Sequence, residues 1–175
     1  MAERARRAGV VTRPLEAPES LRVLREATLG NFNWQGARFE VGDVVERPEF
    51  AHYTRLDLER GDFGVVAMSV QKDPCTQWLG VGWALHLPAE DPGYGFVTPG
   101  IPEISVYVQP EWRDRRVGRL LLRDLHAEAR RRGLGAVSLS VEPANHARLL
   151  YESLGYTDVA SAAPGTMLLD LGPAE

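Results

Sequence analysis

Residues 103–133 read EISVYVQPEWRDRRVGRLLLRDLHAEARRRG and combine a short apolar segment, a proline, an arginine-rich turn and a long amphipathic segment. Positions 104–108 are β-branched or aromatic apart from one serine, which favours a strand, and Pro110 ends it. Apolar residues then recur every three or four positions from Val117 to Ala129, which predicts a helix over 116–132 that stops at Gly133. The turn therefore lies at a helix N-terminus.

The position of this turn suggests phosphate binding. The first turn of a helix leaves backbone N–H groups unpaired and carries the positive end of the helix dipole, so it attracts anions. Gly118 leaves the backbone open to a ligand, and four guanidinium groups surround the turn: Arg113, Arg115, Arg116 and Arg119. A solvated basic helix start that binds nothing would have the same pattern.

Length and composition limit the classes of protein. A chain of 175 residues with 44% hydrophobic residues can build one core, so we expect a flexible arm over 1–8 and a single domain over 9–172. The net charge of −4 argues against nucleic acid as a partner. The single cysteine and the scattered histidines predict no disulfide and no metal site. No window approaches 18 apolar residues, so we expect a cytoplasmic protein with no membrane partner.

The remaining pattern predicts a mixed α/β fold. Strand 104–108, helix 116–132 and a strand over 136–141 form a right-handed crossover with parallel strands. The other elements imply a central, mostly antiparallel sheet flanked by helices: strands 10–13, 63–70, 77–87, 156–159 and 166–171, and helices 18–30, 49–58 and 143–154. Strands 63–70 and 77–87 form a hairpin across a turn at 72–74. The apolar last strand could pair between subunits, as a homodimer.

Two motifs resemble one known family. The stretch VQPEWRDRRVGRLL at 108–121 is similar to the motif V-x-P-x-x-[QR]-x-x-G-x-[GA]-x-x-L-L of the GNAT superfamily of acetyl-CoA-dependent N-acetyltransferases. The segment NHARLLYESLGY at 145–156 follows at that family's spacing. The resemblance implies a GNAT-like fold and acetyl-CoA as acetyl donor. The chain departs from the motif at Arg116, where the family usually has a glycine, and at Asp114, an acidic side chain in a phosphate loop.

The resemblance also implies a set of cofactor contacts. The pantetheine arm would pair with the strand before the turn, at Val106, Tyr107 and Val108, and the backbone N–H of Val108 would polarise the acetyl carbonyl. Asn145 would touch the cofactor, although a helix N-cap explains this residue equally well. The pyrophosphate would lie on the loop formed by Arg113, Asp114, Arg115, Arg116, Val117, Gly118 and Arg119.

Acetyl transfer to an amine needs a base, because a lysine-like amine with a pKa near 10.4 is only about one part in a thousand neutral at pH 7. By resemblance, Glu103 is the candidate base, and Tyr151 is the candidate acid that protonates the departing thiolate. Each also fits a structural role, as an exposed carboxylate at a strand start and as a buried aromatic. Some relatives carry the base on the following strand, where this chain has Ser140.

The acceptor side is expected between the N-terminal helices and the loop 88–100. An aromatic and acidic lining there would favour a cationic amine, from Trp34, Phe39, Glu90, Asp91, Tyr94 and Phe96. The sequence thus predicts an N-acetyltransferase that acts by direct transfer in a ternary complex on a small-molecule, peptide or protein amine. The alternative is a non-catalytic acyl-CoA-binding regulatory module of the same fold. Arg116 favours the module, and Glu103 together with Tyr151 favours the enzyme.

Overall fold

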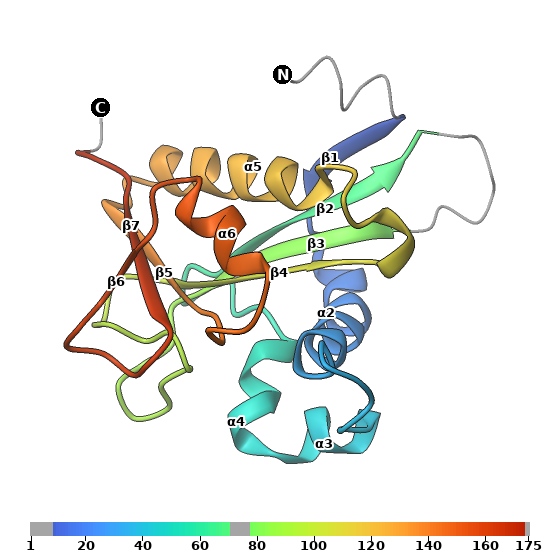
Figure 1. Ribbon diagram of the computed structural model, residues 1–175, viewed down its shortest axis with the longest axis horizontal. Helices are drawn as coiled ribbons and strands as arrows, with labels where there is room; N and C mark the ends of the chain where they lie inside the picture. Colours follow the sequence, from blue (N-terminus) through green and yellow to red (C-terminus); the bar gives the residue numbers. More distant parts are fainter. Residues whose placement is uncertain (1–8, 71–77, 174–175) are drawn as a thin grey trace.

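A computed structural model of the protein describes residues 9–70 and 78–173 (Figure 1). The strands are β1 (Val10–Pro14), β2 (Phe63–Ser69), β3 (Trp78–Leu85), β4 (Glu103–Val108), β5 (Ala136–Ser140), β6 (Thr157–Asp158) and β7 (Thr166–Asp170). The helices are α2 (Ala17–Phe32), α3 (Val41–Glu46), α4 (Pro48–Ala51), α5 (Val117–Arg131) and α6 (Ala147–Glu152), with 3-10 turns η1 (His52–Thr54) and η2 (Pro110–Trp112). The predicted arm 1–8 and turn 72–74 lie outside the described residues.

In the described part of the chain, seven strands form one sheet in the order β1-β2-β3-β4-β5-β7-β6. The pair β4–β5 is parallel and the other pairs are antiparallel, which confirms the predicted mixed sheet with one crossover. Helix α5 lies on one face of the sheet, and α2, α3 and α4 lie on the other (Figure 1). None of the described helices is long and apolar enough to cross a membrane.

Two glycines bring α5 close to the centre of the sheet. A Cβ atom on Gly80 would lie 3.0 Å from Leu121 Cδ1, and one on Gly82 would lie 2.5 Å from Leu125 Cδ1. Both leucines are fully buried, so they fill the space that side chains at Gly80 and Gly82 would otherwise occupy. The pairing of this hairpin shifts register at the same place: Ala67 pairs with Gly80 and Met68 pairs with Trp78, so Leu79 is an extra residue in β3 beside Gly80.

Three helices differ from the sequence prediction. The predicted helix 49–58 is wrong in extent, because α4 ends at Ala51 and continues only as the short turn η1. Helix α3 was not predicted; the side chains of Glu40 and Asp43 cap its N-terminus reciprocally. The helix predicted over 143–154 begins only at Ala147 and has His146 as its N-cap, so Asn145 is not the cap. The Asn145 side chain accepts a 2.9 Å hydrogen bond from the Ala147 N–H just before that helix.

The apolar strand β7 lies inside the sheet. It pairs with β5 on one side, and Met167 and Leu168 pair with the short β6 on the other. Both edges of β7 are therefore paired within the chain at these residues, so β7 cannot pair between subunits there. The homodimer stays a prediction, but not one that uses this strand contact.

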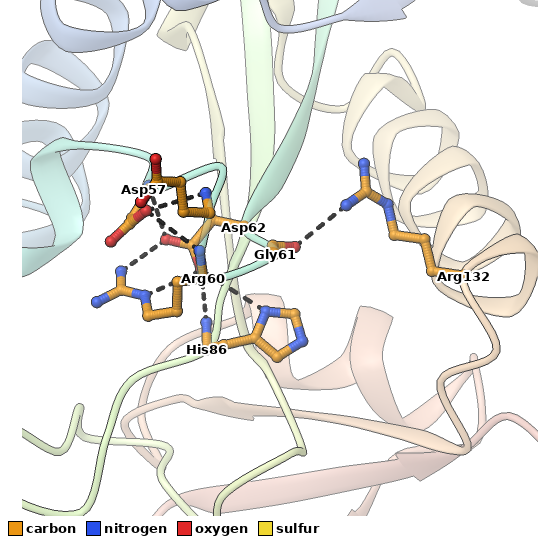
Figure 2. Close-up of polar contacts among 7 residues, drawn as sticks. Asp57, Arg60, Gly61, Asp62, His86 and Arg132 are labelled. Carbon is orange, nitrogen blue, oxygen red and sulfur yellow. Dashed lines mark hydrogen bonds and ion pairs between the residues drawn. The ribbon is translucent and has the colours of Figure 1, made fainter.

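A buried carboxylate fixes the loop that follows η1 (Figure 2). The Asp62 side chain is fully buried and accepts hydrogen bonds from the His86 N–H at 2.7 Å, the Asp57 N–H at 3.0 Å and Arg60 Nη2 at 2.6 Å. Burial raises the pKa of Asp62, but the hydrogen bonds from His86 and Arg60 outweigh it and lower the pKa to about 2. Arg132 of α5 donates to the Gly61 carbonyl at 3.1 Å, so the loop is held from two sides.

Candidate active site

The parallel strands β4 and β5 diverge almost as soon as they meet. Only Glu103 and Ser138 pair between them, and a cavity of about 490 Å³ lies at the resulting fork. The cavity is lined from four directions, by α2, β4, β5 and α6. Four of the predicted site residues line it together: Glu103, Val106, Asn145 and Tyr151.

The register of β4 decides which peptide groups face the fork. The Gln109 N–H donates to the Leu79 carbonyl at 2.9 Å, and antiparallel pairing alternates from there, so the peptide groups of Tyr107 face β3. Those of Val106 and Val108 face the fork. Arg113 Nε reaches the Val108 carbonyl at 3.3 Å. Of the three strand residues predicted to pair with the cofactor, the structure thus turns two toward the fork.

The turn before α5 adopts a strained backbone. Asp114 and Arg116 have φ angles of 56° and 66°, the left-handed region that favours glycine and costs other residues about 1–2 kcal/mol. This conformation explains why a glycine suits position 116, and Arg116 keeps it nevertheless. The first helical hydrogen bond runs from the Leu120 N–H to the Arg116 carbonyl at 3.0 Å, which leaves the N–H groups of 117–119 without intrahelical partners.

The arginines of this turn keep their charge available. Within the described residues, none of the four forms an ion pair with a carboxylate. Arg115 lies over the Trp112 ring at 5.1 Å, and Arg119 donates to Ser153 Oγ at 2.7 Å. A Cβ atom on Gly118 would lie 3.6 Å from Val108 and 3.5 Å from Leu150, so the turn adjoins both β4 and α6.

Glu103 is a buried carboxyl with one unused oxygen. The residue is 5% exposed, and its Oε1 accepts a 2.8 Å hydrogen bond from the Tyr53 hydroxyl. Oε2 has no hydrogen-bond partner among the described residues. Burial raises the pKa of Glu103 to about 7, and the nearby Tyr53 hydroxyl and Gly95 backbone only partly oppose this rise. The expected alternative of an exposed carboxylate is therefore wrong.

The loop between β3 and β4 lies directly against this carboxyl. A Cβ atom on Gly93 would lie 2.0 Å from Glu103 Oε2 and 2.5 Å from the Tyr53 hydroxyl, so only glycine permits the approach. The next residue, Tyr94, donates its backbone N–H to the Tyr53 hydroxyl at 2.8 Å. The loop is thus one wall of the site.

Tyr151 faces the cavity from α6 on the far side of the fork. Burial raises the pKa of its hydroxyl to about 12, so this group is a proton donor at neutral pH. Its ring packs edge-on against Tyr156 at 5.7 Å between centroids, and the Tyr156 hydroxyl is 2.7 Å from His126 Nε2. Tyr151 is thereby packed from behind by a hydrogen-bonded pair.

The acceptor side of the cavity is an aromatic cluster. In each contacting pair of this cluster the ring centroids lie 4.1–6.4 Å apart, and Phe32 contacts all the other members: Phe39, Phe50, Tyr53 and Tyr94. Trp34 also lines the cavity, and its indole N–H donates to Glu142 Oε1 at 3.2 Å. The lining predicted at Glu90, Asp91 and Phe96 is not found, and Asp91 is instead held by His52 Nδ1 at 2.9 Å.

Comparison with known proteins supports the resemblance to the GNAT acetyltransferases. Residues 74–158 match the acetyltransferase (GNAT) domain. Over this segment, which is 85 of the 175 residues, the chain is similar to the GNAT acetyltransferases. No curated protein matches the chain.

Solved GNAT structures share the fold over nearly the whole chain. A GNAT-family acetyltransferase of Staphylococcus aureus Mu50 superposes with a TM-score of 0.64 at 11% identity, over 93% of this chain and 99% of that one. The ribosomal-protein-S18-alanine N-acetyltransferase of Escherichia coli gives 0.61 at 17% identity, over 95% and 96%. A GNAT-family acetyltransferase of Brucella melitensis, solved in complex with acetyl-CoA, gives 0.59 at 18% identity, over 95% and 90%.

Several residues that line the cavity could not be recognised as site residues from the sequence pattern. Tyr53 lies in the three-residue turn η1, and its hydrogen-bond partner Glu103 is fifty positions away in the sequence. Arg38 and Asn31 line the cavity from a region whose pattern is irregular. An alignment of pocket-lining positions could have found them, whereas periodicity could not.

Proposed function

We propose that the protein is an N-acetyltransferase that moves an acetyl group from acetyl-CoA to a primary amine by direct transfer in a ternary complex. One observation carries this proposal: a buried carboxyl with a raised pKa and a tyrosine hydroxyl line the same cavity, at a fork with unpaired peptide groups. The match of residues 74–158 to the GNAT acetyltransferase domain and the acetyl-CoA complex of the Brucella melitensis protein support the choice of donor.

The residues at the fork fit acetyl-CoA. The peptide groups of Val106 and the N–H of Val108 face the fork and can pair with the cofactor without breaking the sheet, while the Val108 carbonyl accepts a hydrogen bond from Arg113. The unpaired N–H groups of 117–119 and the unpaired guanidinium groups suit the pyrophosphate. Bound acetyl-CoA would supply an acetyl group activated as a thioester.

Glu103 is proposed as the general base. Its pKa of about 7 leaves a large fraction ionised at neutral pH, and a base is most effective when its pKa lies near the working pH. The unpartnered Oε2 can accept a proton from the acceptor ammonium, directly or through water. The Tyr53 hydroxyl donates a hydrogen bond to the other oxygen, Oε1, so the carboxyl keeps one orientation while Oε2 accepts the proton.

Tyr151 is proposed as the general acid, opposite Glu103. The amine nitrogen forms a bond to the acetyl carbon, the carbon–sulfur bond breaks, and the Tyr151 hydroxyl gives its proton to the departing sulfur. The backbone N–H of Val108 points into the fork and is the proposed donor to the carbonyl oxygen. The acceptor ammonium loses two protons on becoming an amide: Glu103 takes the first, and the second leaves the nitrogen after the new bond forms and restores the Tyr151 hydroxyl, whose own proton has gone to sulfur. Glu103 then releases its proton to solvent, which balances the reaction.

Release of CoA from acetyl-CoA in the presence of a panel of primary amines tests this function. We expect amine-dependent release, an acetylated amine by mass spectrometry, and intersecting initial-rate patterns, since direct transfer needs both substrates bound together. Parallel patterns would indicate a covalent acetyl-enzyme instead. Binding of acetyl-CoA with no release for any amine would favour the regulatory module.

A further inference from the structure

One cationic side chain lines the acceptor cavity within the described residues. Arg38 lies beyond the C-terminal end of α2 and contributes to the same cavity as Glu103 and Tyr151. Among the described residues it has no acidic partner, since no carboxylate lies within ion-pair distance of it. A guanidinium at the wall of a binding cavity with no anion of its own is a candidate site for a ligand anion.

The local structure holds this guanidinium in place. The Asn33 side chain accepts hydrogen bonds from the Arg38 N–H at 2.8 Å and the Phe39 N–H at 2.9 Å, and donates to the Phe39 carbonyl at 2.9 Å. Arg38 Nη2 donates to the Phe32 carbonyl at 3.3 Å, and its guanidinium lies 5.8 Å from the centroid of the Phe39 ring. One edge of the guanidinium is therefore engaged, and its other N–H groups are free.

Arg47 offers an instructive contrast. Its guanidinium lies over Phe39 and Phe50, at 5.5 Å and 5.6 Å from the ring centroids, on the same aromatic cluster. It is neutralised by Asp43 at 3.0 Å, however, and does not line the cavity. The cluster thus carries two arginines, of which only Arg38 has an unpaired charge at the cavity.

Two carboxyl side chains also line the cavity, Glu103 and Glu142, and Glu142 Oε1 accepts a hydrogen bond from the Trp34 indole N–H. The positions of Glu103 and Arg38 indicate where each part of a ligand would lie. Glu103 lies behind Tyr53, whose ring is 6.2 Å from that of Phe32, and Phe32 in turn provides the carbonyl that holds Arg38. The proton acceptor and the cation are therefore separated by aromatic side chains. An amine near Glu103, an apolar body against these rings and an anion at Arg38 would match the cavity.

We propose that Arg38 forms an anion subsite in the acceptor cavity, and that the acceptor is an amine with an apolar body and a carboxylate or similar anionic group. This inference rests on the proposed function, because it names the substrate class of the same site. It adds an anionic group to the cationic amine expected from the sequence, because Arg38 lines the cavity whereas Glu90 and Asp91 do not.

Binding of matched ligand pairs tests the subsite without requiring transfer. Each pair differs only in its charge: L-phenylalanine with L-phenylalaninamide, and 4-(aminomethyl)benzoate with 4-(aminomethyl)benzamide, which place the anion near the amine and far from it. Each ligand is titrated calorimetrically into the full-length protein saturated with CoA. The variants are Arg38→Gln and, as matched control, Arg47→Gln.

We expect the carboxylate of at least one pair to bind about tenfold more tightly than its amide. This preference should fall below about twofold in Arg38→Gln and persist in Arg47→Gln. Absence of binding by all four ligands, equal binding within both pairs, or a preference that survives Arg38→Gln would overturn the proposal. A carboxylate preference that depends on Arg38, together with no CoA release from acetyl-CoA for any amine, would contradict the proposed function but support the anion subsite.

Discussion

The hydroxyl of Tyr53 donates a 2.8 Å hydrogen bond to Glu103 and accepts one of the same length from the backbone N–H of Tyr94. One side chain thus orients the proposed base and anchors the loop that covers it. Gly93 lets the loop approach, since any Cβ atom there would overlap the carboxyl. The Tyr53 hydroxyl is accordingly a positioning group that acts through Glu103, while the Tyr53 ring lines the acceptor side of the cavity.

Replacement of Tyr53 by Phe should move the pH dependence of activity. The hydrogen bond from the Tyr53 hydroxyl stabilises the ionised carboxyl, so its loss should raise the pKa of Glu103 above about 7. Because the base must be ionised, the acid limb of the kcat/KM profile should shift to higher pH. Tyr94→Phe keeps its backbone N–H and is the control. An unchanged midpoint in Tyr53→Phe would refute the positioning role.

Glu103→Gln should lose activity and gain stability at alkaline pH. We expect kcat/KM to fall about 10²–10⁴-fold with loss of the base. The folded-state pKa is raised, so the stability contributed by the protonated carboxyl is full below the unfolded-state pKa and is lost as pH rises through about 7. The melting temperature of the variant should exceed that of the native protein by several degrees at pH 8 and match it near pH 4.

The exposed carboxylate Glu142, at the same cavity, provides the control for that comparison. Glu142→Gln should change the melting temperature little at either pH. Equal stability of Glu103→Gln and the native protein at pH 8 would mean that ionisation of the buried carboxyl does not destabilise the fold.

Tyr151→Phe should reduce kcat about 10²-fold and leave the KM for acetyl-CoA nearly unchanged, since the hydroxyl acts on the leaving thiolate and not in binding. Steady-state kinetics with a good acceptor measures both constants. Tyr156→Phe is the control, because that hydroxyl faces His126. Turnover within about twofold of the native rate in Tyr151→Phe would remove it as the acid.

Asp62→Asn should destabilise the fold by about 2–4 kcal/mol at pH 7, because a neutral amide cannot accept all the hydrogen bonds of the buried carboxylate (Figure 2). The pKa of Asp62 is lowered to about 2, so its contribution is full above the ordinary pKa and is lost as pH falls from about 4 to about 2. Urea unfolding should therefore show a smaller difference at pH 2.5 than at pH 7. A difference independent of pH would contradict this assignment.

Most of the fold could be predicted from local sequence patterns. The strand, turn and helix of 103–133 are encoded by neighbouring residues, so the crossover and the helix N-terminus could be predicted from the sequence. Glu103 became a candidate through the resemblance to the GNAT superfamily. The acceptor wall could not, because it depends on distant contacts. Tyr53 meets Glu103 through a short 3-10 turn, and Asp91 turns away from the cavity to bind His52. Nothing in the local sequence distinguishes Arg38, which lines the cavity, from Arg47, which does not.

The most direct test of the account is a calorimetric titration of the protein with acetyl-CoA, with CoA and ATP as comparison ligands. The left-handed backbone at Arg116 preserves the helix N-terminus despite the missing glycine, and the fork offers the peptide groups of Val106 and Val108. We predict binding of acetyl-CoA at one site with a Kd in the micromolar range, and no binding of ATP. No binding of acetyl-CoA, or equal binding of ATP, would contradict the proposed cofactor site and the transferase function built on it.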